Sequence, residues 1–295
     1  MRIAVYQART GVDPAANAAA LAAAVADAAA GGAAMVFTPE MSGLLDRDRD
    51  RARVHYRREA DDPVLATVRQ AARQAGTWVQ LGSLALLGEE GERLVNRAFL
   101  IDGEGEIRAR YDKMHLFDVD LPTGESWRES ASFAAGDRPV VADSPAGLIG
   151  LSICYDLRFS GLYAKLSEAG ATVLSIPAAF TVPTGEAHWH VLLRARAIEA
   201  EAFVVAAAQG GTHEDGRATY GHSLVIDPWG RVLLDMGGES PALGFADLDL
   251  PEVGAVRTRL PVLAHRRLIP DPVRAIIGSP SPPETAGQRG ALPTR

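Results

Sequence analysis

Short apolar runs alternate with longer helix-like runs along this 295-residue chain, and no other feature narrows the possible folds as much. The run "RIAVYQ" at 2–7 precedes an alanine-rich stretch at 14–30, and "AAMVFTP" at 33–39 precedes a polar segment with helical periodicity. A further strand-like run, "TWVQLGSLAL", follows at 77–86. Alternation of this kind predicts an α/β fold and not a helical bundle.

The alanine-rich stretch carries the signals of a helix despite its low complexity. Pro14 stands near its start, Leu21 and Val25 are four residues apart, and two glycines, Gly31 and Gly32, follow its end. These features are a start signal, a buried stripe and a stop signal. We predict a helix that packs closely on a sheet.

The second half of the chain repeats the order of the first half. The strand-like run "LIGLSICYD" at 148–156 leads to a helix from about Ser160 to Ala169, then to Gly170 and to "ATVLSIPAAF" at 171–180. In both halves a strand, a helix, a Gly-Ala step and a second strand lead into a proline. This echo suggests two sheets packed face to face, with helices outside; its period is too long for a solenoid.

The last third of the chain holds one more helix-to-strand segment, a hairpin and a tail. We predict a helix running into a strand over 188–209, and a hairpin over 222–236 that turns at 227–230. From 278 to 295 the chain is rich in Pro, Gly and Ser and poor in large apolar side chains. We expect one domain over 1–277, followed by a tail that is flexible or packed on a partner subunit.

The charge balance and the cysteine count argue against several classes of function. The net charge is −7 and Lys and Arg do not cluster, so we expect no nucleic-acid partner. A single cysteine excludes an internal disulfide and a multi-cysteine zinc site, and it fits a reducing compartment. The first residues read as a strand and not as a signal peptide, and no apolar run is long enough to cross a bilayer. We expect a cytoplasmic protein without a membrane span.

The single cysteine, Cys154, follows directly after the apolar run "LIGLSI". A position at the carboxyl end of a buried strand, with a helix a few residues on, resembles a nucleophile elbow. A buried, inert cysteine is the alternative, and Cys154 alone does not decide between the two. None of the histidines stands out as a base for the thiol, and Ser152 is a poor nucleophile candidate because Cys154 replaces the last glycine of G-x-S-x-G.

Two charged residues stand in unusual settings. Glu40 ends "AAMVFTPE" directly after a proline, and Lys113 precedes an apolar turn in "RYDKMHLFD". Taken singly, each is more typical of a surface charge. Burial of both side chains close together would instead produce the shifted pKa values that acid–base catalysis uses.

Three segments together are similar to the signature motifs of the nitrilase, or carbon–nitrogen hydrolase, superfamily. They are "FTPE" around Glu40, "YDKMHLFDVDLP" around Lys113 and "GLSICYDLRF" around Cys154. The order Glu, Lys, Cys agrees as well, and the resemblance extends from "IAVYQ" to "LPVLAHRR". Within the superfamily the chain resembles the branch of deaminated glutathione amidases, with the omega-amidases next.

The resemblance implies a four-layer α-β-β-α sandwich of two packed sheets and an enzyme without metal or cofactor. It implies that Cys154 is the nucleophile, that Glu40 is the general base, and that Lys113 and the Tyr155 backbone N–H hold the oxyanion. The accessory glutamate of the family falls on Glu129, in "WRES". Assembly as a homodimer or a higher homo-oligomer is implied as well, and "VLLRARAIEAEAF" at 191–203 is apolar on more than one side.

The implied reaction is hydrolysis of the amide of a small 2-oxo acid through a thioester. The first expected substrate is deaminated glutathione, which yields 2-oxoglutarate and cysteinylglycine. The alternatives are an omega-amidase acting on 2-oxoglutaramate or 2-oxosuccinamate, and a nitrilase. Arg158 is a candidate for binding the substrate carboxylate, and pairing with Asp156 is its alternative role. Two departures from the branch are His190, where a glutamate is usual, and "RRLIPD" at 266–271.

Overall fold

The computed structural model describes residues 1–88, 93–120, 124 and 126–274. The chain divides into two units, Met1–Ala264 and His265–Arg295. All described helices and strands belong to the first unit, and the described part of the second unit, 265–274, has neither. The tail predicted for 278–295 lies outside the described residues, so the domain boundary remains a prediction.

Helices and strands follow one another in the alternating order that the sequence predicts. The strands are β1 Arg2–Gln7, β2 Met35–Phe37, β3 Trp78–Leu87, β4 Leu94–Ile101, β5 Ile107–Asp112, β6 Asp118–Asp120, β7 Ser126–Arg128, β8 Phe133–Ala134, β9 Val140–Ser144, β10 Gly147–Leu151, β11 Val173–Ser175, β12 Phe203–Ala206, β13 Gly210–Thr212, β14 Ala218–Tyr220, β15 Leu224–Ile226, β16 Val232–Asp235 and β17 Ala242–Asp247. The helices are α1 Pro14–Ala30, α2 Arg49–Arg53, α3 Pro63–Ala75, α4 Ser160–Glu168, α5 Val182–Ala200 and α6 Pro251–Arg259, with short 3₁₀ helices η1 Glu59–Asp61, η2 Glu129–Ala131 and η3 Cys154–Arg158.

Two sheets form the centre of the first unit. One sheet has the order β17-β1-β2-β3-β4-β5, with β8 beside β4, and the other has the order β16-β15-β12-β11-β10-β9. In the first sheet β1, β2 and β3 run parallel, and in the second sheet β10, β11 and β12 run parallel. Each sheet therefore contains the parallel unit that a strand–helix–strand repeat predicts.

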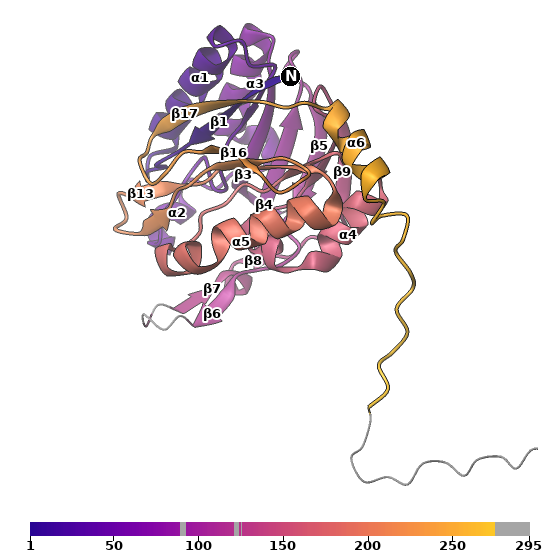
Figure 1. The fold of residues 1–295 in the computed structure, drawn as a ribbon. Coiled ribbons are helices and arrows are strands. Elements are labelled where there is room, and N and C mark those ends of the chain that lie inside the picture. The colour runs from indigo at the N-terminus through magenta and orange to yellow at the C-terminus, as the bar shows by residue number, and fades with distance from the viewer. Residues whose placement is uncertain (89–92, 121–123, 125, 275–295) are drawn as a thin grey trace, which may run out of the picture. The chain divides into compact units, whose positions relative to one another are not determined.

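The hydrophobic core lies between the two sheets. Ile3 and Val5 of β1 share one buried cluster with Ile149 and Leu151 of β10. The opposite face of the first sheet packs against α1 and α3, whereas α4 and α5 contribute to the core around the second sheet. Figure 1 shows α1 and α3 on one side of the strands and α4 and α5 on the other. The prediction of a four-layer α-β-β-α sandwich is confirmed.

The alanine-rich helix α1 is built as the sequence predicts. Asp13 precedes it and accepts a hydrogen bond from the Ala15 backbone N–H at 2.9 Å. Gly31 ends it in close contact with the first sheet, since a Cβ atom there would lie 2.4 Å from the Phe245 ring. Small side chains thus let α1 approach the sheet, and the predicted close packing is confirmed.

The two strand–helix–strand repeats bring the ends of β2 and β11 close to one another, since Glu40 after β2 is hydrogen-bonded to Ala179 after β11. In the first repeat, β1-α1-β2, the last strand leads into Pro39 and Glu40, and in the second repeat, β10-α4-β11, it leads into Pro177. The hairpin predicted over 222–236 is formed by β15 and β16.

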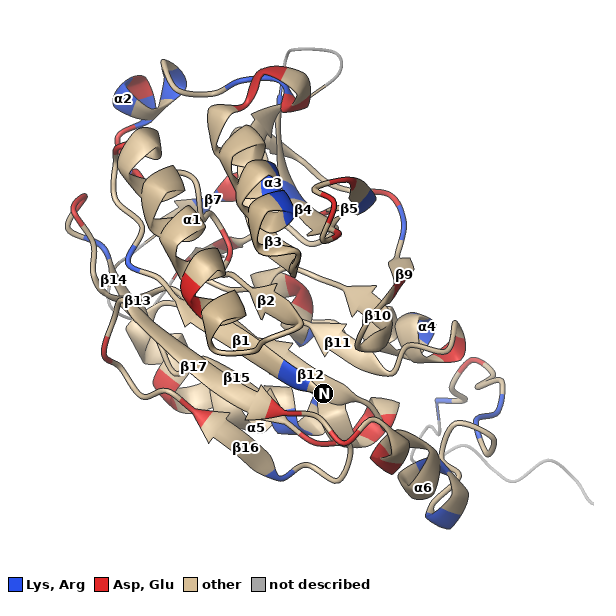
Figure 2. Ribbon diagram, turned by 90° about the horizontal axis from the view of Figure 1, so that it is seen from above, with Lys and Arg blue, Asp and Glu red and all other residues tan. Residues whose placement is uncertain are grey.

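Figure 2 shows charges of both signs interspersed on loops and helix surfaces, with the strands mostly uncharged. None of the helices in the described ranges combines the length and the apolar character needed to span a bilayer.

Candidate active site

Glu40 lies just beyond β2, and two side chains and one backbone N–H from separate parts of the chain donate hydrogen bonds to its carboxylate. Oε1 accepts from Lys113 Nζ at 2.8 Å and from Asn96 Nδ2 at 2.9 Å. Oε2 accepts from the Ala179 backbone N–H at 3.0 Å. The residue is only 4% exposed, so a charge that looks like a surface charge in the sequence is buried in the fold.

Lys113 directly follows β5 and shares its ammonium group between two glutamates. Besides the bond to Glu40, Nζ donates to Glu129, 2.9 Å from Oε2 and 3.2 Å from Oε1. Glu129 begins η2, and its Oε2 also accepts from the Phe117 backbone N–H at 2.7 Å. Lys113 is 2% exposed, so these hydrogen bonds replace the water that a lysine ammonium normally binds.

Cys154 is the first residue of η3, at a sharp turn just beyond β10. Its φ of 49° lies in the left-handed region, which a residue with a Cβ atom seldom adopts. Its backbone N–H donates to the Pro177 carbonyl at 2.8 Å, which ties the turn to the end of β11. The residue is 7% exposed, and its thiol donates to the Glu40 carboxylate. The strand-to-helix turn predicted from the sequence is therefore present, with η3 placed before α4.

Burial and charge shift the pKa values of these groups in different directions. Burial acts to raise the pKa of Glu40, but the Lys113 charge and hydrogen bonds from Cys154, Lys113 and Asn96 outweigh it, so the pKa is lowered. Burial acts to lower the pKa of Lys113, but the charges of Glu129 and Glu40 raise it well above its usual value. Burial, reinforced by the Glu40 charge and opposed by Lys113, raises the pKa of Cys154 well above its usual value. The resting site thus pairs an ionised carboxylate with a protonated thiol.

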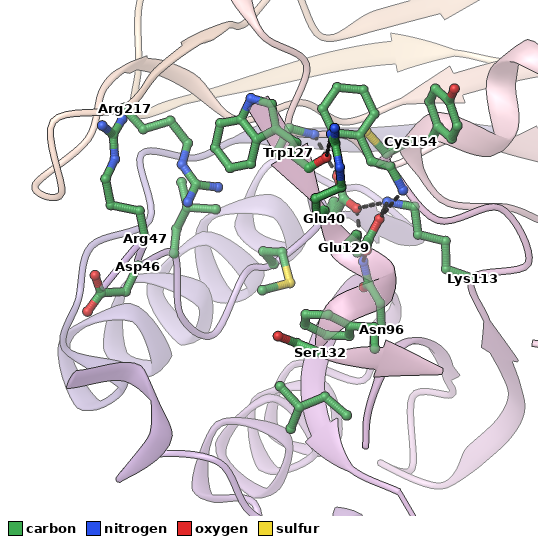
Figure 3. A pocket seen from close by; sticks show the side chains of 18 of the residues that line it. Glu40, Asp46, Arg47, Asn96, Lys113, Trp127, Glu129, Ser132, Cys154 and Arg217 are labelled. Carbon is green, nitrogen blue, oxygen red and sulfur yellow. Dashed lines mark hydrogen bonds and ion pairs between the residues drawn. The ribbon is translucent and has the colours of Figure 1, made fainter. Parts of the chain in front are cut away.

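The four side chains line one side of a cavity of about 780 Å³. Figure 3 shows Glu40, Lys113, Glu129 and Cys154 close together there, with dashed lines between Lys113 and the two glutamates. A nucleophile, a base and a cation therefore meet at a space that a small molecule could enter.

Tyr155 and Arg158 also line this cavity. The Arg158 guanidinium lies over the rings of Tyr155, at 5.9 Å, and Phe180, at 5.3 Å, and its Nη1 is 3.2 Å from His188 Nδ1. The alternative pairing of Arg158 with Asp156 is wrong, because Asp156 is fully buried and holds other residues.

Asn96 is a site residue that the sequence reasoning missed. It lies in β4, and its Nδ2 donates to Glu40 Oε1 at 2.9 Å and to Glu129 Oε1 at 3.2 Å. The available signal was a single amide within the otherwise apolar and charged strand "LVNRAFLI". That signal is weak, because polar residues commonly occupy one face of a strand.

The comparison with protein families agrees with this arrangement. A family model described as carbon-nitrogen hydrolase matches residues 2–258. The chain belongs to the carbon–nitrogen hydrolase family. The resemblance seen in the three sequence segments is thereby confirmed, and the protein is a hydrolase of carbon–nitrogen bonds.

This carbon–nitrogen hydrolase is similar to proteins from several organisms. It is 41% identical over 243 residues to the "Deaminated glutathione amidase" of Yersinia enterocolitica, which covers 81% of this chain and 83% of that protein. Among solved structures, the C. elegans NitFhit protein matches with a TM-score of 0.82 at 38% identity, over 90% of this chain and 65% of that chain. A mutant amidase from Nesterenkonia sp. AN1, described with acrylamide added at its active site cysteine, matches with a TM-score of 0.73 at 28% identity, over 88% and 98% of the two chains.

The departure at His190 lies outside the cavity lining of this hydrolase. His190 Nε2 is 2.9 Å from Asp235 Oδ2, and His222 Nδ1 is 3.0 Å from Asp235 Oδ1. Among the described residues, these three form the one group of such side chains with ligand atoms close enough to hold a metal ion. Each Asp235 carboxylate oxygen already has an imidazole nitrogen as its hydrogen-bond partner. The group therefore serves as a hydrogen-bonded link between α5 and β16.

Proposed function

We propose that this chain is a cysteine-dependent amidase that hydrolyses deaminated glutathione to 2-oxoglutarate and cysteinylglycine. The observation that carries the proposal is the meeting of the single cysteine with Glu40, Lys113 and Glu129 at one cavity. The name of the Yersinia enterocolitica relative, at 41% identity over 83% of its length, supports this substrate.

In the first step Cys154 attacks the amide carbonyl carbon. The thiol transfers its proton to the Glu40 carboxylate, with which it is already hydrogen-bonded, and the sulfur forms a bond to carbon. The electron pair of the carbonyl π bond moves to oxygen. A lysine ammonium has three N–H donors, and Lys113 directs two of them to Glu40 and Glu129, so the third can bind the oxyanion together with the Tyr155 backbone N–H.

In the second step the tetrahedral intermediate collapses to a thioester. Glu40 gives the proton it received to the amide nitrogen, the carbon–nitrogen bond breaks, and the amine leaves. A water molecule then enters, gives a proton to Glu40 and attacks the thioester carbon. The second tetrahedral intermediate expels the sulfur, which recovers the proton from Glu40, and the carboxylic acid is released. Each proton that Glu40 takes is returned within the cycle.

The size of the cavity favours the larger of the candidate substrates. A space of about 780 Å³ is in the range that accommodates drug-sized ligands, and 2-oxoglutaramate would fill a small part of it. Arg158, which lines the cavity next to the Cys154 turn, is suited to bind the 2-oxo acid carboxylate. An omega-amidase or a nitrilase would use the same four side chains, so the assay has to compare the substrates.

The test measures product release from deaminated glutathione, 2-oxoglutaramate and a simple nitrile. We expect the highest kcat/KM for deaminated glutathione, with 2-oxoglutarate and cysteinylglycine released in equal amounts. Cys154→Ala should abolish turnover of every substrate. Ser152→Ala is the matched control, because Ser152 is a buried hydroxyl two residues away, bonded to Tyr163 and to the Ser175 carbonyl. Turnover in Cys154→Ala, or a preference for the nitrile, would refute the proposal.

We also propose that the enzyme is a cytoplasmic homo-oligomer. The family resemblance and the apolar residues exposed on α5 support assembly, and a single cysteine without a disulfide partner fits a reducing compartment.

A further inference from the structure

Four arginines line the part of the cavity formed by α2 and its neighbouring loops. They are Arg47, Arg49, Arg53 and Arg217. Figure 3 shows Arg47 and Arg217 together, well apart from Lys113 and Cys154 on the opposite side of the pocket. We call these four residues the distal arginine cluster. The proposed reaction chemistry uses none of them.

Among the residues that line this part of the cavity, the four arginines outnumber one carboxylate, Asp46. Asp46 lines the cavity, and Asp215 contacts Arg47 and Arg217. Asp46 is occupied by Arg51, whose Nε is 2.6 Å from Oδ2. Asp215 is shared, at 3.2 Å from Arg217 Nη2 and 3.9 Å from Arg47 Nε. Arg47 and Arg217 thus share one ion-paired carboxylate, and the charges of Asp46 and Glu40 act on Arg217 from further away.

The Nε atom of Arg217 is a buried donor without an acceptor among the described residues. Its side chain is 16% exposed, and its guanidinium lies 4.7 Å from the centroid of the Trp127 ring. Within the described residues, neither Arg217 Nε nor Trp127 Nε1 has a hydrogen-bond partner, although both atoms are buried. Buried polar groups are almost always paired, because an unpaired one loses its hydrogen bonds to water. Arg217 thus lines the cavity with hydrogen-bonding capacity that the described residues do not fully use.

We propose that the distal arginine cluster binds a carboxylate at the far end of the leaving group. The proposal rests on the proposed function, since it names the part of the substrate that lies on the amine side of the scissile bond. Arg217 and Arg47 together offer planar, forked donors, which match a carboxylate in geometry and charge. The enzyme then selects amides whose amine portion is a short peptide with a free C-terminal carboxylate, with Arg158 holding the acid at the other end.

The test compares deaminated glutathione with the same compound after its glycine carboxylate has been converted to a neutral amide. We expect the wild-type enzyme to prefer the acid, measured as a ratio of kcat/KM values. Arg217→Gln and Arg47→Gln should each lower this ratio by about tenfold, since each removes a charge-assisted hydrogen bond. Arg217→Lys should retain part of the preference, because it keeps the charge and loses the fork.

Arg138→Gln is the matched control. It removes the same charge from an exposed arginine that pairs with Asp137 outside this cavity, and it should leave the ratio unchanged. Arg47→Gln guards against a folding defect in Arg217→Gln, because the Arg47 side chain is 50% exposed. Equal kcat/KM values of the wild-type enzyme for acid and neutral amide would overturn the proposal, and so would an unchanged ratio in both variants.

A second measurement separates this proposal from the proposed function. If deaminated glutathione is not hydrolysed, the proposed function fails. The distal arginine cluster can still be tested with any other amide that the enzyme hydrolyses, by measuring how strongly cysteinylglycine inhibits that reaction. Stronger inhibition by cysteinylglycine than by its C-terminal amide, lost in Arg217→Gln, supports the carboxylate site. Equal inhibition by the two dipeptides overturns it.

Discussion

At the scale of single residues, burial and one ammonium group together set the protonation states of the site. Lys113 stabilises the charge of Glu40, while burial and the Glu40 charge keep the Cys154 thiol protonated. The nucleophile is therefore not a preformed thiolate, unlike cysteines that sit beside a histidine or a helix N-terminus. A base in direct contact with the sulfur is needed for that reason, and Glu40 occupies this position.

Replacing Glu40 should have opposite effects on thiol ionisation and on turnover. In Glu40→Gln the negative charge that raises the pKa of Cys154 is gone, whereas the Lys113 charge that lowers it remains. We predict a lower Cys154 pKa and amide hydrolysis reduced by at least about a hundredfold, because the base is lost. The pKa can be read from the ultraviolet absorbance of the thiolate against pH, since the chain has one cysteine.

Glu104→Gln serves as the control, because it removes a carboxylate whose side chain is 83% exposed. Its Cys154 pKa should equal the wild-type value. A Cys154 pKa that rises or stays constant in Glu40→Gln would contradict the electrostatic account of the site.

At the scale of elements, one buried carboxylate connects the segment of Lys113 to the turn of Cys154. Asp156 in η3 accepts from the Tyr111 hydroxyl at 2.7 Å and from the His115 backbone N–H at 3.0 Å. It also accepts from the Ile153 backbone N–H at 2.9 Å. Its partners thus stand two residues before and two residues after Lys113, and one residue before Cys154. This side chain holds the distance between the nucleophile and the cation.

Asp156→Asn should weaken both the fold and the reaction. An asparagine presents an N–H group to partners that are themselves donors, so we predict a loss of about 2–3 kcal/mol in the free energy of unfolding. We also expect kcat to fall about tenfold or more, because small displacements of reacting groups are costly. Urea unfolding and steady-state kinetics measure the two effects.

Asp143→Asn, which changes an exposed aspartate of β9, is the control and should match the wild-type enzyme. Unchanged kcat in folded Asp156→Asn would show that this link does not position the catalytic groups.

At the scale of the whole molecule, α5 packs one face against the second sheet and exposes apolar side chains on another face. Val191 is 69% exposed and Ile198 is 45% exposed, and the two residues are seven apart on one helix face. The turn of the β15–β16 hairpin lies beside them, with Arg194 Nε donating to the Gly230 carbonyl at 2.8 Å and Trp229 55% exposed. Contiguous apolar surface of this kind is typical of interfaces.

We predict that this face joins two copies of the chain. Val191→Glu should lower the molar mass measured by static light scattering, because a carboxylate buried at an interface is unfavourable. Val54→Glu, which places the same charge on a residue that is 64% exposed elsewhere, should leave the molar mass unchanged. A wild-type protein that is monomeric at micromolar concentration would contradict the prediction.

Local signals explain which parts of the fold were predictable. The start and stop residues of α1, the echo of β1-α1-β2 in β10-α4-β11 and the hairpin turn are each contained in a few consecutive residues. The positions of Glu40, Lys113 and Cys154 were predictable through three separate motif segments. Asn96 and the distal arginine cluster were not, because Asn96 is a single amide within a strand and Arg217 meets Arg47 only in the folded chain.

By itself, the sequence determined the order of the elements and the identity of the residues that carry the chemistry, since capping, periodicity and motif are properties of neighbouring positions. Only the tertiary structure decided which of these residues meet. The Glu40 carboxylate binds an N–H group 139 positions away, at Ala179, and burial together with Lys113 sets its ionisation. Electrostatic interactions and desolvation depend on distance in space and on exclusion of water, and no segment of the chain specifies either alone.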